Sequence, residues 1–136
     1  MIVVDTGPVV AAASVRDADH AASLAALSAL REPALMSPFV ATEVCYFLST
    51  RATPAAEAAF LRSLVAGTFV LAELSAVDLE RTAELVEQYA GLPLGAADAS
   101  VIALAERHNV TTVLTLDRRH FTIVRPRHVG SFELFP

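Results

Sequence analysis

Short runs of apolar, often β-branched residues alternate along this chain with longer segments in which apolar residues recur every three or four positions. Runs of the first kind are typical of buried strands, and segments of the second kind are typical of amphipathic helices. We predict strands over residues 2–4, 34–36, 68–71 and 111–116, and a last short strand over 121–124.

The predicted helices begin at residues that can cap a first turn. Ser37 and Thr53 each precede a proline, and Ser75 stands three positions before Asp78, as in a capping box. We predict that one helix begins at residue 9 and that a second, which follows two acidic residues at 17 and 19, ends at residue 30. Further helices are predicted over 38–50, 54–66, 76–89 and 96–107.

The alternation of strands and helices predicts a parallel sheet with helices on its faces. No internal repeat, low-complexity stretch or linker interrupts the pattern, so we expect residues 1–136 to form a single α/β domain. A hydrophobic content of 54% excludes a disordered chain.

The composition also bears on location and redox chemistry. The mean hydropathy is +0.52, yet the longest uncharged run, 20–30, is only about half a membrane span. The first four residues lack the basic region of a secretory signal, so we expect a cytoplasmic protein without a membrane segment. Cys45 is the sole cysteine, and we expect it to be buried as a small apolar side chain.

Charge is distributed unevenly along the chain. The net charge is -5, but residues 107–136 carry five arginines against two acids, whereas residues 1–106 carry five arginines against thirteen acids. An acidic body with a basic tail is not typical of a general nucleic-acid binder, although the tail offers phosphate a local binding surface.

Four carboxylates do not fit the usual structural explanations for acidic residues. Asp5 and Asp117 each follow a predicted strand directly, at the edge where parallel sheets bind ligands. Glu43 and Asp98 project from apolar helix faces, where unpaired charges are rare. Neither has an arginine three or four positions away, although pairing over a longer range stays open.

Carboxylates that converge need a cation or raised pKa values, since two of them about 4 Å apart repel by roughly 4 kcal/mol at an effective dielectric constant near 20. Oxygen ligands select hard ions, Mg²⁺ or Mn²⁺. Such an ion suits phosphodiester cleavage because it acidifies a bound water and neutralises phosphate charge. The chain has no GxSxG, P-loop or GxGxxG motif that would indicate another chemistry.

At these residues the sequence resembles the PIN-domain family, and within it the VapC-type toxins of bacterial toxin–antitoxin pairs. The resemblance lies in Ile-Val-Val-Asp5-Thr6, Glu43, Gly95-Ala-Ala-Asp98-Ala-Ser and Thr115-Leu-Asp117-Arg-Arg-His-Phe121. It covers almost the whole chain and implies a three-layer α/β/α fold with a short central parallel sheet. It also implies a metal-dependent endoribonuclease that forms a homodimer and is inhibited by a small antitoxin protein encoded alongside.

The resemblance assigns a role to each of the four acids. It makes Asp5, Glu43, Asp98 and Asp117 the catalytic residues, with Asp5 and Asp98 as direct ligands of Mg²⁺ or its substitute Mn²⁺. Glu43 and Asp117 would complete the acidic pocket, either directly or through water.

Four further residues would support the acids or the RNA substrate. The resemblance implies that Thr115 orients Asp5 by hydrogen bonding and that Thr6 helps in a similar way. Arg118 and Arg119 follow the last acid and are the candidates for binding RNA phosphates.

Two other classes of protein compete with this interpretation. Receiver domains are also small α/β folds with acids at strand ends, but they use a lysine beside the phosphate, and this chain has no lysine. A non-toxin or catalytically inactive PIN-like domain that only binds RNA or assembles with partners is the second alternative. The complete acid set argues against it, and a nuclease assay with a chelator control separates both from the endoribonuclease.

Overall fold

A five-stranded sheet, in which every neighbouring pair of strands is parallel, organises the computed structural model, which describes residues 1–136. The strands are β1 (Val3–Val4), β2 (Ala34–Met36), β3 (Phe69–Leu71), β4 (Thr112–Leu114) and β5 (Glu133–Phe135). Their order across the sheet is β3-β2-β1-β4-β5, which places β1 at the centre. The predicted parallel α/β architecture is confirmed.

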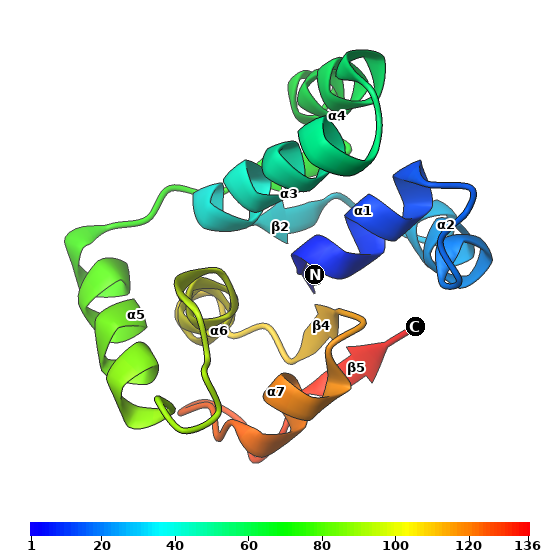
Figure 1. The fold of residues 1–136 in the computed structure, drawn as a ribbon. Helices are drawn as coiled ribbons and strands as arrows, with labels where there is room; N and C mark the ends of the chain where they lie inside the picture. The colour runs from blue at the N-terminus through cyan, green and yellow to red at the C-terminus, as the bar shows by residue number, and fades with distance from the viewer.

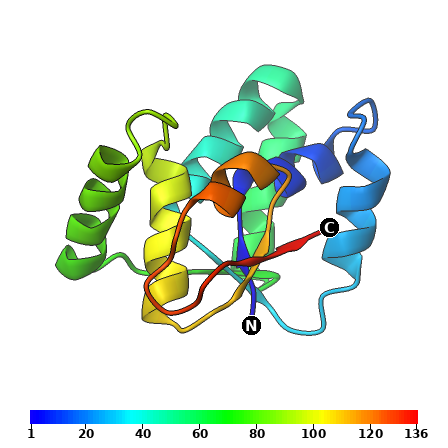
Figure 2. The ribbon, with the colours of Figure 1, turned by 90° about the horizontal axis from the view of Figure 1, so that it is seen from below.

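Helices flank the sheet and complete the three-layer arrangement. They are α1 (Thr6–Ala13), α2 (His20–Ser28), α3 (Pro38–Arg51), α4 (Pro54–Val65), α5 (Ala76–Gln88), α6 (Ala96–Arg107) and α7 (Arg118–Ile123). Helices α5 and α6 pack together on one side of the strands, and α1 and α2 pack together on the other (Figures 1 and 2). Helix α3 contacts both α1 and α6, so it joins the two outer layers.

The predicted capping residues begin their helices as expected. The Ser37 hydroxyl accepts the N–H of Phe39 at 3.1 Å, and the Thr53 hydroxyl accepts the N–H of Ala56 at 3.1 Å. At the start of α5 the capping box is complete, because Ser75 and Asp78 bond each other's backbone N–H groups. These local signals fix where α3, α4 and α5 begin.

The core is formed by the central strands and by α6. Val3 and Val4 of β1 lie opposite Val113 and Leu114 of β4, and all four side chains are fully buried. Helix α6 is buried from residue 99 to residue 105, because α5, α3 and β1 all pack against it. No helix combines the length and the apolar composition that crossing a membrane would require.

The prediction of a strand over residues 121–124 is wrong. Residues 121–123 belong to α7, whose first turn is capped by the Asp117 side chain, and Val124 follows the helix directly. The fifth strand is β5, further along the chain. Phe121 and Val124 are both buried, three positions apart, while the two residues between them are exposed. That spacing is helical, and it outweighs the β-branched composition of the segment.

Three smaller differences concern element limits and burial. The first helix begins at Thr6, directly after Asp5, rather than at residue 9, and β4 ends at Leu114, two residues earlier than predicted. The prediction that Cys45 is buried is also wrong, because this side chain is only partly covered on α3.

The strand order changes direction beside β1. From β1 the chain moves through β2 to β3 on one side of the sheet, and it later places β4 and β5 on the other side. The backbone N–H of Asp5 donates to the carbonyl of Leu114 at 2.9 Å, which holds the ends of β1 and β4 together. Open α/β sheets bind ligands at such a change of strand order.

Candidate metal-binding active site

A cavity of about 800 Å³ opens at the carboxyl ends of β1 and β4. The four carboxylates singled out in the sequence, Asp5, Glu43, Asp98 and Asp117, all line it. They come from four separate parts of the chain: the start of α1, the middle of α3, the first turn of α6 and the segment before α7. The fold therefore brings all four predicted acids to one site.

Asp5 is the most deeply buried of the four, with 4% of its surface exposed. Burial raises its pKa from 3.8 to about 7, and the nearby charges of Asp98 and Glu43 act in the same direction. A hydrogen bond from the Thr115 hydroxyl and one from the Thr6 backbone N–H oppose this increase only in part. Without a cation, the Asp5 carboxyl therefore stays protonated at acidic pH and loses its proton only near neutral pH.

The two threonines that the resemblance placed beside Asp5 differ in their contacts, because the Thr115 hydroxyl bonds Asp5 and the Thr6 hydroxyl does not. The Thr115 hydroxyl donates to Asp5 Oδ2 at 2.8 Å and accepts the backbone N–H of Asp117 at 2.9 Å, so one side chain positions two of the acids. Thr6 lines the cavity, but its buried hydroxyl has no hydrogen-bond partner. A buried hydroxyl without a partner beside a carboxylate cluster is consistent with a site that receives a further polar group.

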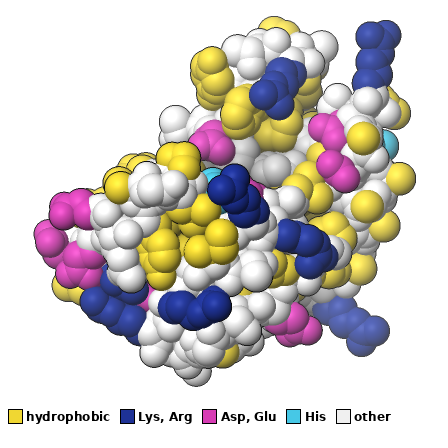
Figure 3. All heavy atoms as spheres, turned by 60° about the horizontal axis from the view of Figure 1, so that its bottom comes forward, with side chains coloured by type: hydrophobic (Ala, Val, Ile, Leu, Met, Phe, Trp, Pro, Cys, Tyr) yellow, Lys and Arg dark blue, Asp and Glu magenta, His cyan; other side chains and the backbone are white.

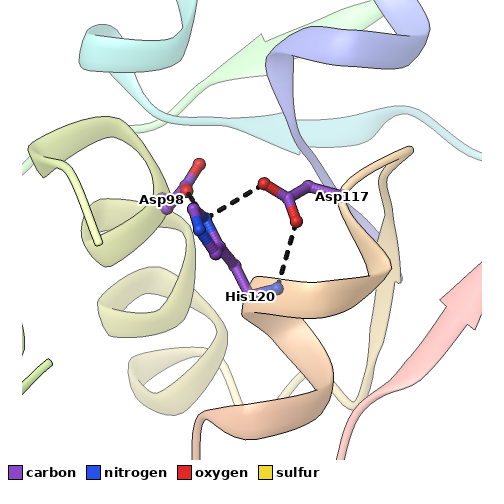
Figure 4. Close-up of side chains that lie close together, drawn as sticks. All are labelled: Asp98, Asp117 and His120. Atoms are coloured by element: carbon purple, nitrogen blue, oxygen red, sulfur yellow. Dashed lines mark hydrogen bonds and ion pairs between the residues drawn. The ribbon is translucent and has the colours of Figure 1, made fainter. Parts of the chain in front are cut away.

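Asp98 and Asp117 converge on His120, which projects from α7 (Figure 4). The His120 Nδ1 atom lies 2.7 Å from Asp98 Oδ2 and 3.0 Å from Asp117 Oδ2. The second oxygen of Asp117 accepts the His120 backbone N–H at 3.0 Å. Burial raises the pKa of Asp98 and the charge of Asp117 adds to this effect, whereas the contact with His120 opposes it.

Glu43 completes the cavity from α3. It is half-buried, it takes part in no ion pair, and its charge contributes to the raised pKa of Asp5. The longer-range pairing with arginine that the sequence left open does not occur for Glu43 or for Asp98. Glu43 therefore has no charged partner within the chain, and the one basic partner of Asp98 is His120.

The side chains in the cavity fit a divalent cation. One ligand atom each from Asp98, Asp117 and His120 lies within 4.8 Å of the other two, and Asp5 is coupled to Asp98 through its charge. Carboxylate oxygens suit Mg²⁺ and Mn²⁺, and the imidazole extends the range toward softer ions. A cation would also offset the repulsion that raises the pKa of Asp5 and Asp98.

With this geometry in place, a family model described as PIN domain matches residues 2–125. The chain belongs to the PIN-domain family. This PIN domain is 36% identical over 135 residues to Ribonuclease VapC26 of Mycobacterium tuberculosis. The matched stretch covers 99% of this chain and 100% of the relative.

A solved structure supports the fold of this PIN domain. The crystal structure of VapC20 from Mycobacterium tuberculosis, a sarcin-ricin loop cleaving toxin, superposes with a TM-score of 0.86 over 100% of both chains. The two sequences are 18% identical, so the similarity shows the shared fold.

Arginines border the cavity of this PIN domain. Arg51, Arg118 and Arg119 all line it, and the acidic residue Asp17 lines it as well. A side-chain N–H of Arg118 donates to the carbonyl of Pro136, whereas the Arg119 side chain forms no ion pair and no hydrogen bond within the chain. In the view of Figure 3, arginine side chains are scattered among apolar, uncharged and acidic ones, so this face carries no continuous basic belt.

The sequence reasoning missed His120 as a member of the acidic cluster. The signal was available, because His120 follows Asp117 by three positions, and residues three apart lie on one face of a helix. It was hidden because residues 121–124 looked like a strand, so no helix was expected to begin at Arg118. Arg51 was missed as well, since nothing local connects the end of α3 with the acids.

Proposed function

We propose that this PIN domain is a Mg²⁺-dependent or Mn²⁺-dependent endoribonuclease that acts as the toxin of a toxin–antitoxin pair. The observation that carries the proposal is the convergence of four carboxylates in one cavity, with the pKa of the innermost, Asp5, raised to about 7. The 36% identity to a ribonuclease over nearly the whole chain supports it.

Each acid has a role in the proposed reaction. Asp5 and Asp98 would hold the metal ion, and Glu43 and Asp117 would complete the pocket directly or through water. When bound, the ion supplies an acidified water and charge neutralisation at the phosphate. Thr115 fixes Asp5 Oδ2 by a hydrogen bond at 2.8 Å, which limits the rotation of this carboxylate.

The cavity offers binding groups for a polyanion but few candidates for covalent catalysis. Arg118 and Arg119 lie beside the last acid and would bind RNA phosphates. No serine or cysteine lines the cavity, and Cys45 lies elsewhere on α3. This favours direct attack by water over a covalent intermediate.

The toxin role includes protein partners as well as RNA. By its relation to the VapC proteins, we expect a cognate antitoxin and a homodimer of this chain. Light scattering of the purified protein, and co-purification with the product of a neighbouring small gene, test these two expectations. A monomer at micromolar concentration with no co-purifying partner would contradict both.

The reaction is tested by cleavage of single-stranded and hairpin RNA. We expect cleavage with Mg²⁺ or Mn²⁺, binding without efficient turnover with Ca²⁺, and no cleavage in EDTA, because the larger calcium ion acidifies its water less. The products should carry 5′-phosphate and 3′-hydroxyl ends by mass spectrometry. Cleavage that persists in EDTA and leaves cyclic 2′,3′-phosphates would overturn the four-carboxylate assignment.

A further inference from the structure

One wall of the cavity continues beyond the acids along α3. Glu43, Phe47 and Arg51 are spaced four residues apart on this helix, and all three line the cavity. At about 1.5 Å per residue, Phe47 lies about 6 Å and Arg51 about 12 Å along the helix axis from Glu43. The helix therefore leads outward from the acidic centre through an aromatic ring to a cation.

Phe47 and Arg51 are in direct contact. The guanidinium carbon of Arg51 lies over the Phe47 ring, 4.3 Å from its centroid. The ring itself is half-buried against the core and meets the edge of Tyr46 at a centroid distance of 5.5 Å. Phe47 thus supports the exposed, planar guanidinium from below.

The charge of Arg51 is not neutralised within the chain. Arg81, Arg107 and Arg127 each pair with a carboxylate, whereas the Arg51 side chain forms no ion pair and no hydrogen bond, although it lines an acidic cavity. Its position over the ring, rather than on Glu43, leaves a flat cationic surface open toward the cavity.

Such a surface suits an unpaired nucleobase. Proteins that bind single-stranded RNA stack unpaired bases on aromatic rings and on arginine guanidinium planes, because every base has a π-face. The guanidinium adds attraction for the polyanionic strand, which a ring alone would not supply. A position one to two helical turns from the acids would suit a nucleotide that neighbours the cleaved phosphate.

We propose that Arg51, supported by Phe47, is a base-stacking subsite that binds a nucleotide adjacent to the scissile phosphate of the RNA substrate. This inference rests on the proposed function, since it names how the same cavity holds its substrate. The subsite contributes to RNA affinity and to the choice of the cleaved bond, whereas the four acids carry out the cleavage.

The test uses fluorescently labelled single-stranded RNAs of one sequence, each with a single abasic nucleotide at a different position along the strand. Binding is measured by fluorescence anisotropy, in EDTA and in Ca²⁺, so that no turnover is needed. For the wild-type protein we expect one abasic position to weaken binding about tenfold, the size of one base-stacking contact. In Arg51→Lys and Phe47→Leu, we expect intact RNA to bind about tenfold more weakly and that abasic position to have almost no further effect.

Two controls keep the test specific. Arg62→Gln removes an exposed arginine of α4 that does not line the cavity, and it should bind every RNA as the wild type does. Phe47 packs against the core, so circular dichroism checks the fold of Phe47→Leu. Arg51 is exposed, so Arg51→Lys decides the matter if the phenylalanine variant does not fold.

The outcomes separate the subsite from the proposed function. The subsite is overturned if the wild-type protein binds no RNA or if no abasic position weakens binding. It is also overturned if the same abasic position weakens binding as much in both variants as in the wild type, which would indicate that Arg51 contacts a phosphate. If the abasic pattern appears but Mg²⁺ supports no cleavage, the base-stacking contact at Arg51 stands, whereas the nuclease and the placement beside a scissile phosphate do not. If RNA is cleaved without the abasic pattern, the nuclease stands and the subsite does not.

Discussion

The two ends of α6 carry charged clusters that differ in one respect, which is whether the charges are paired. At the start of the helix, Asp98 faces Asp5 and Asp117 across the cavity, and His120 is the sole basic side chain that contacts it. At the end of the helix, Glu106 is surrounded by arginines. The cluster at the start of α6 therefore has an excess of negative charge, whereas the cluster at the end of α6 is balanced.

The balanced network ties three parts of the chain together. Arg81 of α5 holds both oxygens of Glu106 in a forked contact, at 2.8 and 2.9 Å, and the backbone N–H of Arg127 donates to Glu106 at 3.0 Å. Burial alone would raise the pKa of Glu106, but these hydrogen bonds outweigh it, so the pKa is lowered. The ionised form of Glu106 therefore stabilises the fold.

The acidic end behaves in the opposite way. The pKa values of Asp5 and Asp98 are raised, so their ionised forms oppose folding until a cation compensates for them. The comparison teaches that burial alone does not distinguish a structural charge from a functional one. The partners decide, and the cluster without enough partners marks the site.

The largest effect on activity should come from removing one negative charge at the acidic end of α6. We expect Asp98→Asn to lower the rate of RNA cleavage by about 1000-fold, equivalent to about 4 kcal/mol, because it removes a proposed metal ligand while keeping the side-chain volume. Single-turnover kinetics measures this loss. Glu106→Gln, at the other end of the same helix, should retain cleavage when assayed well below its melting temperature. Equal losses in both variants would remove the functional distinction between the two ends.

The balanced end should instead control stability. We expect Glu106→Gln to lower the free energy of unfolding by about 3 kcal/mol, because the nearly buried guanidinium of Arg81 loses its charged partner. Urea denaturation measures the change. A double variant, Arg81→Met with Glu106→Gln, should recover part of the loss, since it leaves no unpaired charge. No recovery would show that Arg81 has a separate structural role.

His120 tests how far the acidic end depends on its one basic contact. We expect His120→Ala to raise the Mg²⁺ concentration needed for half-maximal cleavage by about tenfold, the usual cost of losing a group that orients a metal ligand. His108→Ala is the matched control, because His108 is exposed at the end of α6 and should leave the Mg²⁺ requirement unchanged. An unchanged requirement in His120→Ala would mean that Asp98 and Asp117 are positioned without it.

The smallest effect concerns pH and the metal-free protein. The pKa of Asp5 lies at about 7 in the folded chain against 3.8 ordinarily, so the folded state binds this proton more tightly than the unfolded state does. The resulting stability is fully present below about pH 4 and is lost as the pH rises through 7.

We therefore expect Asp5→Asn, in EDTA, to melt at least about 4 °C above the wild type at pH 8, and at nearly the same temperature at pH 4. Differential scanning calorimetry at the two pH values measures the difference. A variant that melts below the wild type at pH 8 would show that ionised Asp5 supports the fold through its hydrogen bond with Thr115.

The sequence predicted those elements whose signals are local. The caps at Ser37, Thr53 and Ser75 and the strands beside them depend on neighbouring residues, and the structure has them where they were expected. Helix α7 and strand β5 were not predicted correctly, because the structure there depends on the burial of Phe121 against distant residues, among them Phe132. A short segment with mixed propensity is decided by its tertiary contacts.

The four acids could be singled out because a carboxylate on an apolar surface is conspicuous in a sequence. Their mutual arrangement could not be predicted, since it depends on the pairing of β1 with β4 and on the packing of α6. The same holds for the contact of His120 with Asp98, which joins residues 22 positions apart. The sequence thus indicates which groups are unusual, and the fold determines which of them meet.

The single hydroxyl of Thr115 also ties the site to the synthesis of the protein. It bonds Asp5, which lies 110 positions earlier in the chain, and it holds the backbone of Asp117, near the end. Thr115 and Asp117 follow Asp5, Glu43 and Asp98 in the chain, so no fragment that ends before residue 115 contains the hydroxyl or the fourth acid. The acidic pocket therefore cannot assemble during synthesis until the chain has been translated past Asp117 and β4 has paired with β1.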